Sequence, residues 1–399
     1  MTSESIIKAA FHVWGRELYL STSLVQVARE LGVSKTALYR HFTGKQALLE
    51  AMRTHFFDDY SQFIRQGYEK ALGIADLRER ILVMIRSITE YYVRNRDASL
   101  FALIMVFGSK DAGSMMGPMQ ERGVDLKNLL SPGSPELPFL FNMIMATTTF
   151  RLAVFHRLEC SDGTAEAPAE GLVGETVASI ERHIRRGLGL NRAELEPLDC
   201  EGLENSLALD FGAMHDDDGL LKAVAQAVAE AGPWDASMDM VARRSGLSKS
   251  GLYAHFKNKE DMIRQLFLTE FDRIAFFVET STGDAGRPGD RLYLMVFSAA
   301  AYLRSNPEIL IALDWIRNRR LNMGPPRTLK IFEIMGRSVP PGAGENAGLT
   351  TEQMVHWVLF LIINALMYRP QGMDFADLPN SRIRSLYKFI TLGLEGFES

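Results

Sequence analysis

The chain has 399 residues, of which 47% are hydrophobic and 23% are charged, and its net charge is −5 at pH 7. This is the composition of an ordinary globular protein, and it excludes collagen-like, mucin-like and disordered chains. The negative net charge excludes a histone-like polycation, so any surface for nucleic acid has to be local. At about 100–200 residues per domain, the length predicts more than one domain.

Cysteine content and hydropathy indicate the compartment. The chain has only two cysteines, Cys160 and Cys200, which excludes a disulfide scaffold and favours a reducing environment. Residues 1–5 lack the basic and apolar regions of a secretion signal. The longest apolar stretch, Met354–Tyr368, has 15 residues, fewer than the ~20 that a membrane helix needs. We therefore expect a cytoplasmic protein that does not contact a membrane.

The first predicted element is a helix near the N-terminus. Ile7, Ala10, Phe11 and Trp14 recur at the spacing of one helix face, so they form a single apolar stripe. Such a stripe has to pack against neighbouring elements, which indicates a supporting helix in a small helical domain.

Two short helices joined by a glycine turn are predicted next. Ser23 followed by Gln26 is a capping-box pattern for the second helix. Gly32 ends that helix, because glycine adopts the left-handed conformation that a tight turn requires. Ser34 is placed to cap a third helix, in which Leu38 points inward. The pattern predicts a helix-turn-helix preceded by a supporting helix.

These elements recur 214 residues later. Segment 34–45 aligns with segment 248–259 without a gap, and seven of the twelve positions are identical. Fainter matches follow at offsets of 211 and 206: Arg80, Met84, Ser87, Tyr91 and Asn95 align with Arg291, Met295, Ser298, Tyr302 and Asn306, and Ser179, Ile184, Gly187 and Leu188 align with Ser385, Ile390, Gly393 and Leu394. The chain therefore contains two tandem copies of a unit of about half its length, and the fold class predicted for both copies is all-α.

Both copies carry a basic window around the third helix. Between Leu31 and Leu49 there are three basic residues and no acid, and between Arg243 and Lys259 there are five basic residues and no acid. A solvated helix face explains one such window, but two windows at equivalent places favour a local electropositive surface for nucleic acid.

At these residues the sequence resembles the tetracycline-repressor (TetR) family of bacterial regulators. The run G-[VL]-S-K-x-x-L-Y-x-H-F-x-x-K is typical of that family and occurs in both copies. The resemblance implies three N-terminal helices that bind double-stranded operator DNA, followed by a larger helical domain that binds an effector and dimerises. It also implies a bacterial cytoplasmic protein that associates with the nucleoid when bound to DNA.

The resemblance assigns roles residue by residue. Base edges are expected to be approached by Lys35, Thr36, Ala37 and Arg40 in the first copy and by Lys249, Ser250, Gly251 and Ala254 in the second. Phosphates are expected to be held by Tyr39, His41 and Lys45 and by Tyr253, His255 and Lys259, with the hydroxyls of Ser34 and Ser248 at the helix N-termini. We expect both sets of phosphate contacts to behave alike.

The chain departs from the family in carrying two units, and this sets the domain prediction. We expect an intrachain pseudo-dimer in which helices near 138–158 and 172–190 pack on those near 351–369 and 380–397, while further self-association stays open. The predicted segments are a first helix-turn-helix domain at 1–48, a first helical ligand-binding and dimerisation domain at 49–190, a linker at 191–219, a second helix-turn-helix domain at 220–262 and a second helical domain at 263–399.

No cofactor or enzymatic centre is predicted. Nineteen methionines favour an adaptable apolar cavity for a small hydrophobic effector, although no individual pocket residue follows from the sequence. His156 and Cys160 have the spacing of metal ligands on a helix, but no further ligand accompanies them. A nucleophile elbow, a HExxH motif and a dinucleotide fingerprint are all absent from the sequence.

Two functional hypotheses follow from these patterns. The first is an effector-released repressor whose two modules read an asymmetric operator, because Arg40 aligns with Ala254 and the two recognition helices differ. The alternative is an interaction or small-molecule sensor protein in which one or both modules no longer bind operator DNA.

Overall fold

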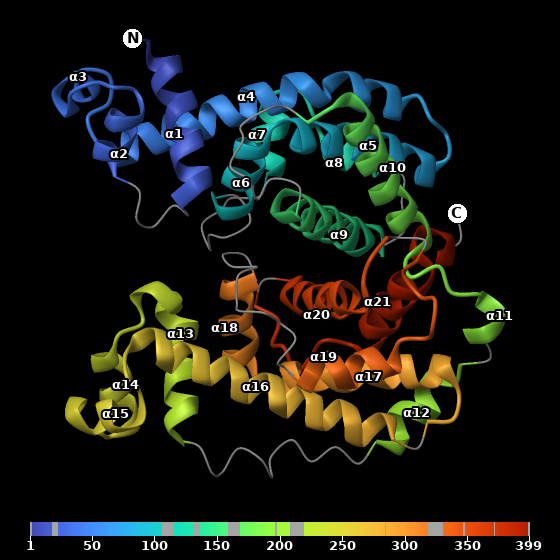
Figure 1. Cartoon of the computed structure of the whole chain (residues 1–399). Helices are drawn as coiled ribbons and strands as arrows, with labels where there is room; N and C mark the ends of the chain where they lie inside the picture. The colour runs from blue at the N-terminus through green and yellow to red at the C-terminus, as the bar shows by residue number, and fades with distance from the viewer. Residues whose placement is uncertain are drawn as a thin grey trace. The chain divides into compact units, whose positions relative to one another are not determined.

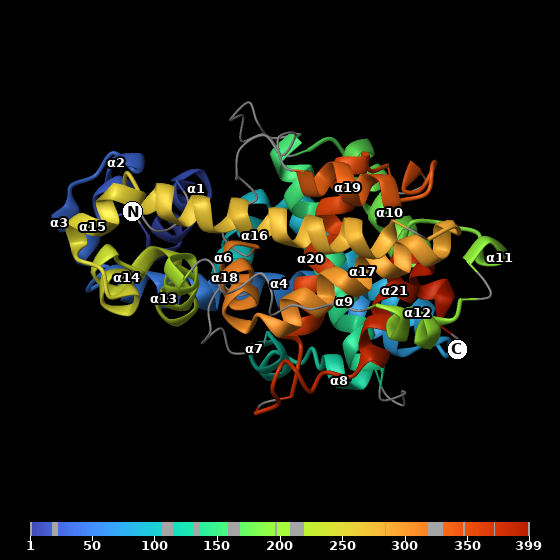
Figure 2. The ribbon, with the colours of Figure 1, turned by 90° about the horizontal axis from the view of Figure 1, so that it is seen from below.

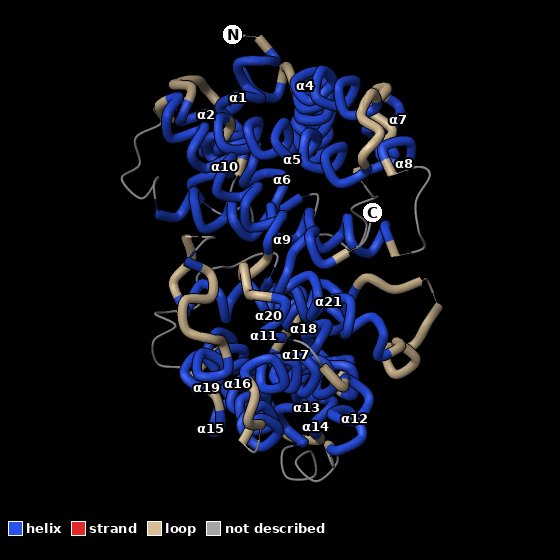
Figure 3. The backbone as a smooth tube through the Cα atoms, turned by 90° about the vertical axis from the view of Figure 1, so that its right-hand side faces the viewer, coloured by secondary structure: helices blue, strands red, loops and turns tan. Residues whose placement is uncertain are grey.

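The computed structural model describes residues 2–17, 23–105, 115–130, 136–158, 168–195, 198–207, 219–283, 285–317, 330–345, 348–370 and 372–397. Over these residues every regular element is a helix, which confirms the predicted all-α fold (Figure 3). The chain divides into two compact units. The first comprises residues 1–137 and 148–181, and the second comprises residues 138–147 and 182–398.

The first unit begins with the predicted helix-turn-helix and its supporting helix, at one end of a long helix (Figure 1). These elements are α1 (Ser3–Glu17), α2 (Leu24–Glu30), α3 (Lys35–Tyr39) and α4 (Lys45–Leu72). The apolar stripe of α1 is buried, with Ala10 inaccessible and Trp14 only 3% exposed. Gly32 joins α2 to α3 at a φ of 66°, the left-handed conformation that was predicted.

Six further helices follow along the described residues up to Arg186. They are α5 (Leu77–Arg94), α6 (Arg96–Met105), α7 (Met116–Glu121), α8 (Leu126–Leu129), α9 (Leu137–Leu158) and α10 (Glu170–Arg186). Helix α5 packs along α4, and between them Phe56, Tyr60, Tyr91 and Tyr92 form a buried aromatic cluster. Residues 138–147 of α9 and the end of α10 from Arg182 belong to the second unit.

The second unit repeats this plan, with a helix-turn-helix at one end of α16 (Figure 2). Its remaining helices are α11 (Arg192–Leu195), α12 (Cys200–Ser206), α13 (Gly219–Asp235), α14 (Met238–Ser245), α15 (Lys249–His255), α16 (Lys259–Thr282), α17 (Pro288–Ser305), α18 (Pro307–Arg317), α19 (Lys330–Ser338), α20 (Thr351–Met367) and α21 (Asn380–Leu392), closed by the 3₁₀ turn η3 (Gly393–Gly396).

The sequence repeat is also a repeat of contacts. The hydroxyl of Tyr91 donates to Asp59 Oδ2 at 2.8 Å, and 211 residues later the hydroxyl of Tyr302 donates to Glu270 Oε2 at 2.5 Å. The same offset relates two further pairs of side chain–carbonyl bonds: Arg80 to Ile74 and Arg291 to Ala285, and Asn95 to Tyr91 and Asn306 to Tyr302. The faint sequence match therefore reflects equivalent helix-packing positions in the two units.

Residues 191–195 and 198–207 of the predicted linker form a folded connector within the second unit. Glu204 of α12 is nearly buried and accepts hydrogen bonds from Tyr293, from Asn380 and, at 2.8 Å, from Arg384 Nε. Burial raises the pKa of Glu204, but these hydrogen bonds outweigh it and hold the pKa below its ordinary value. The carboxylate therefore ties the connector to α17 and α21, while Asp216–Asp218 lie outside the described residues.

One helix changes the expectation about membrane-length segments. Over Leu137–His156, α9 is long and apolar enough by length and composition to cross a membrane, although the sequence predicted no segment of that length. Its most apolar window is 67% buried inside the protein. Burial of this kind is typical of a core helix, because the apolar side chains are already covered by protein.

A buried histidine on α9 makes the stability of the first unit depend on pH. His156 is 4% exposed, and its Nε2 donates to the carbonyl of Tyr92 at 3.0 Å. Burial lowers its pKa from 6.5 to about 4, so the folded state favours the neutral ring.

We predict that the free energy of unfolding is independent of His156 titration above pH 6.5. As the pH falls from 6.5 toward 4, the lowered pKa of His156 should reduce the free energy of unfolding by up to about 3 kcal/mol. His156→Gln keeps a donor for the Tyr92 carbonyl but does not titrate. Urea unfolding of both proteins at pH 5 and pH 7.5 measures the effect. The wild-type free energy of unfolding should fall more steeply toward low pH than that of His156→Gln, and equal pH dependence would contradict the assignment.

Candidate nucleic-acid interface

Helix α3 exposes most of the side chains predicted for the first recognition helix. Ser34 caps the helix by accepting a hydrogen bond from Ala37 N at 3.2 Å. Leu38 is fully buried and anchors the helix to the module. The opposite face is consequently exposed, and it carries Lys35, Thr36, Tyr39 and Arg40.

Helix α15 repeats this arrangement in the second unit. Ser248 accepts a hydrogen bond from Gly251 N at 3.0 Å, and Leu252 is fully buried. Tyr253 is 51% exposed, compared with 43% for Tyr39 in the first module. A tyrosine that presents this much of its ring and hydroxyl to solvent in both modules is available to an external partner. The remaining exposed predicted residues are Lys249, Ser250, Ala254 and His255.

The other predicted phosphate contacts lie where the next helix begins. Lys45 and Lys259 are the first residues of α4 and α16. His41 is exposed just after α3, where its Nδ1 lies 3.3 Å from the Ser3 hydroxyl. Each module therefore gathers its eight predicted residues along one recognition helix and the following helix start.

The two modules differ in the surroundings of their first recognition-helix lysine. In the second module, Lys249 Nζ lies 3.1 Å from Asp239 on α14, an ion pair that partly neutralises it. The equivalent of Asp239 in the first module is Val25, and there the ammonium of Lys35 lies over the ring of Tyr39, 5.5 Å from its centroid. The first module therefore presents more uncompensated positive charge at this position.

The modules also differ at the start of the helix that follows. In α16, Asn258 caps Asp261 N at 2.8 Å, while Asp261 accepts from Lys257 N at 3.0 Å, a bond that holds the pKa of Asp261 below its ordinary value. In α4, Ala47 takes the place of Asp261, and Gly44 provides no side-chain cap. A carboxylate at a helix N-terminus competes with phosphate for the same amide groups. The acid-free basic window of the second copy ends at Lys259, so Glu260 and Asp261 lie just outside it.

The described part of the chain contains no candidate metal centre. No cluster of three or more His, Cys, Asp or Glu side chains suited to a metal occurs in the described ranges. His156 is engaged with the Tyr92 carbonyl, and Cys160 lies outside the described residues.

Comparison with known proteins identifies the modules. Residues 6–52 and 220–266 each match the model of the bacterial regulatory proteins, tetR family. The uncharacterized HTH-type transcriptional regulator Rv1255c of Mycobacterium tuberculosis is 22% identical over 162 residues, which cover 40% of this chain and 78% of that protein.

Two solved structures of transcription regulators are similar to a part of the chain of comparable length. The fatty acid degradation regulator FadR from Bacillus halodurans is 20% identical, with a TM-score of 0.35, and covers 44% of this chain and 98% of its own. The transcriptional regulator FadR from Bacillus subtilis, solved in complex with stearoyl-CoA, is 16% identical with a TM-score of 0.35 and the same coverage.

The two modules define a helix-turn-helix DNA-binding protein that acts in transcription regulation. Both modules, at residues 6–52 and 220–266, match the tetR family of bacterial regulatory proteins, so the chain carries two DNA-binding domains of that kind in tandem. The Mycobacterium tuberculosis relative is likewise named as a transcriptional regulator, not as an enzyme.

Proposed function

We infer that this chain is a non-catalytic, effector-responsive repressor that grips one operator with both of its helix-turn-helix modules. The observation that carries this inference is the duplicated recognition helix, which in each module is capped by serine, anchored by a buried leucine and exposes tyrosine and lysine. Exposed donors of this kind suit phosphate oxygens and base edges. We propose that the protein acts in the cytoplasm and is located on the nucleoid when it is bound to DNA, and the match of both modules to a family of transcription regulators supports this.

A reciprocal backbone contact in the second unit supports an intrachain pseudo-dimer. Gly187 at the end of α10 and Gly393 at the end of α21 are equivalent positions of the repeat. A Cβ on Gly187 would meet the Ile390 carbonyl, and a Cβ on Gly393 would meet the Ile184 carbonyl, which is the equivalent atom. Contacts in which residue i meets j and j meets i are the signature of a two-fold interface.

Side chains extend this contact. Trp357 of α20 is fully buried and donates from Nε1 to Thr147 Oγ1 at 3.1 Å. Its ring also contacts that of His183 of α10, with 4.2 Å between the ring centroids and a tilt of 54°. Helices α9 and α10, which come from the first copy of the repeat, thus contribute to the core around α20 and α21. We propose that this packing of α9 and α10 on α20 and α21 takes the place of the subunit interface of a two-chain regulator, since fused halves meet at high effective concentration.

We propose that the operator is asymmetric. Arg40, exposed at the end of α3, can donate two bonds to guanine O6 and N7, whereas Ala254 can contact at most a thymine methyl. The Lys249–Asp239 pair and Asp261 further weaken the positive field of the second module. The structure therefore favours a first module that contributes more binding free energy than the second.

Fluorescence anisotropy with DNA that flanks the protein's own gene tests the proposed function. Saturable binding that depends on sequence supports a regulator. Absence of binding to any such DNA, in a folded sample, would support the alternative of a sensor or interaction protein whose modules no longer contact operator DNA.

We predict that Tyr39→Ala with Lys45→Ala weakens binding to all DNA sequences similarly and lowers the slope of log affinity against log salt by about one. Tyr253→Ala with Lys259→Ala should act in the same direction but less strongly, because Asp261 already occupies the start of α16. Titrations at several salt concentrations measure both effects. If either double variant leaves affinity and slope unchanged, that module is not in contact with DNA.

A further inference from the structure

Asp239 is an acidic residue on the helix-turn-helix surface of the second module, where none of the predicted DNA contacts uses it. It lies in the first turn of α14, the helix that precedes recognition helix α15. Its side chain is 56% exposed, so it is open to a partner that binds this module. A carboxylate repels phosphate because both groups are anionic. We therefore expect Asp239 to oppose a DNA backbone that comes close to α14.

The carboxylate of Asp239 also holds a lysine of the recognition helix. Lys249 Nζ lies 3.1 Å from Oδ1 and 3.3 Å from Oδ2 of Asp239, so the ammonium contacts both oxygens. The two side chains are equally exposed, which places the ion pair on the surface of the module. Because an ammonium has three N–H donors, Lys249 can still donate to a further acceptor. The pair consequently has no net charge but keeps a capacity to donate hydrogen bonds.

The first module has no acid at the equivalent position. Val25 of α2 aligns with Asp239 at the repeat offset of 214 and is 44% exposed. The ammonium of Lys35, the equivalent of Lys249, lies 5.5 Å from the centroid of the Tyr39 ring. Contact with a neutral ring leaves the positive charge of a lysine in place. The two modules therefore hold equivalent lysines in different electrostatic surroundings.

A role in helix stability can be separated from a role in DNA binding. Ser237 caps α14 by accepting a hydrogen bond from Met240 N at 3.2 Å, so the helix start has a cap besides Asp239. An exposed acid in the first turn adds modest stability through the helix dipole. Removal of this charge would then lower stability, whereas release of Lys249 would raise the affinity for DNA.

We propose that Asp239 is a specificity-determining residue that lowers the affinity of the second module for non-operator DNA. Non-specific binding comes almost entirely from phosphate contacts, which the charge of Asp239 opposes and for which a paired Lys249 is a weak partner. Base edges carry no net charge, and Lys249 can still donate to guanine O6 or N7. Asp239 thus favours operator over other DNA. This inference rests on the proposed function, because it requires the second module to contact DNA.

Fluorescence anisotropy titrations of the full chain test this role, with a duplex selected from a random pool and with a scrambled duplex of the same composition. At several salt concentrations, Asp239→Asn should bind the scrambled duplex about two- to fivefold more tightly than the wild type. Its slope of log affinity against log salt should steepen by up to about one. The selected duplex should gain less, so the ratio of the two affinities should fall. In a Lys249→Met background, Asp239→Asn should have a smaller effect, because no lysine is released.

Val25→Asp is the reciprocal variant in the first module. It places an acid at the second residue of α2, as Asp239 is the second residue of α14. We expect it to weaken binding to the scrambled duplex by a similar factor and to flatten the salt slope. Urea unfolding of both variants supplies the structural control. A purely structural role predicts a less stable Asp239→Asn variant with unchanged affinity.

The outcomes distinguish this inference from the proposed function. If the wild type binds the selected duplex but Asp239→Asn changes neither affinity nor salt slope, the role of Asp239 is wrong and the proposed function stands. An equal gain on both duplexes would indicate a general electrostatic effect and would overturn the assignment to specificity. If the folded wild type binds neither duplex, the proposed function fails and this inference fails with it.

Discussion

Gly187→Ala and Gly393→Ala are each expected to destabilise the second unit by roughly 2–6 kcal/mol. Both glycines have left-handed backbone conformations, with φ of 56° and 57°, which cost a non-glycine residue about 1–3 kcal/mol. In addition, a Cβ on Gly393 would lie 2.5 Å from Gly187 N and Ile184 O, and a Cβ on Gly187 would lie 2.7 Å from Gly393 N. Because these neighbours are backbone atoms, the helices themselves would have to separate, at a further cost of about 1–3 kcal/mol.

Two control glycines separate the two causes. Gly372 has a φ of 83° but open space around a Cβ, so Gly372→Ala should show only the conformational cost. Gly171 lies on α10 with open space and no positive φ, so Gly171→Ala should be neutral or slightly stabilising. The free energies come from urea unfolding. Because Gly187 and Gly393 share one crossing, their double variant should cost less than the sum of the two, and a cost for Gly187→Ala as small as that for Gly171→Ala would contradict the reciprocal contact.

Arg40→Ala is expected to remove the difference between the two half-sites of the operator. A good bidentate contact to guanine discriminates by about 1–3 kcal/mol, or roughly 5- to 150-fold in affinity. The wild-type protein should therefore select half-sites with different consensus bases, and the Arg40→Ala variant should lose the guanine preference on one side. The control is Ala254→Arg, which places arginine at the equivalent exposed position of α15 and should add that preference to the other half-site.

Selection from a random DNA pool measures these preferences. Three proteins are compared: wild type, Arg40→Ala and Ala254→Arg. A symmetric wild-type consensus would contradict the asymmetric operator. A consensus that is asymmetric but unchanged in Arg40→Ala would show that other residues, such as Thr36 and Ser250, produce the asymmetry.

Local chemistry in the sequence was sufficient to predict the modules. The serine caps at Ser34 and Ser248 and the left-handed Gly32 all occur as expected, and Gly246 repeats the left-handed conformation in the second copy. These features depend on residues within a few positions of one another, which a sequence pattern records directly. The alignment at an offset of 211 also relates the hydrogen bond of the Tyr91 hydroxyl to its equivalent in the second copy, because buried polar groups need partners.

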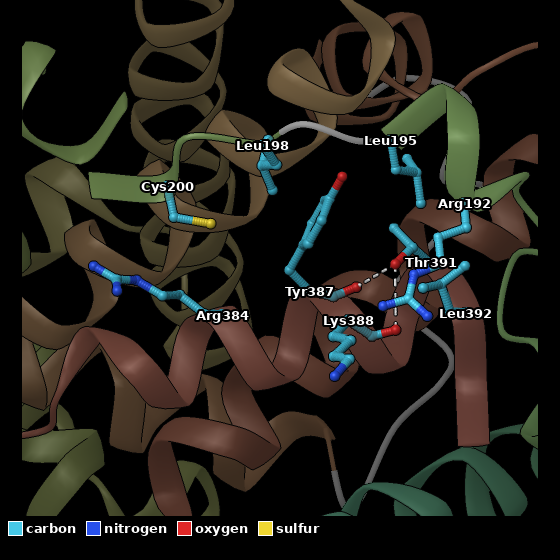
Figure 4. Close-up of a pocket in the computed structure, with 9 residues that line it drawn as sticks. All are labelled: Arg192, Leu195, Leu198, Cys200, Arg384, Tyr387, Lys388, Thr391 and Leu392. Atoms are coloured by element: carbon cyan, nitrogen blue, oxygen red, sulfur yellow. Dashed lines mark hydrogen bonds between the residues drawn. The ribbon is translucent and has the colours of Figure 1, made fainter. Parts of the chain in front are cut away.

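Features that depend on distant residues were not predictable in the same way. The connector was expected to be a linker, yet Glu204 binds Arg384, which is 180 residues further along the chain. A cavity between the connector and α21 likewise forms only because folding brings Leu195 and Tyr387 together (Figure 4). The acid at Asp261 is visible in the sequence, where its equivalent in the first copy is Ala47. Its effect on the anion-binding capacity of the helix start follows only from the structure, in which Asp261 accepts from Lys257 N.

The mass of the complex with a selected operator tests the central claim that one chain supplies both DNA-binding modules. Light scattering of the free protein should give the mass of one chain, 44.7 kDa, at every protein concentration examined. The complex with DNA should have the mass of one operator plus one chain. A complex that always contains two chains per operator, with no single-chain species at any dilution, would contradict the intrachain pseudo-dimer and indicate an assembly with four modules.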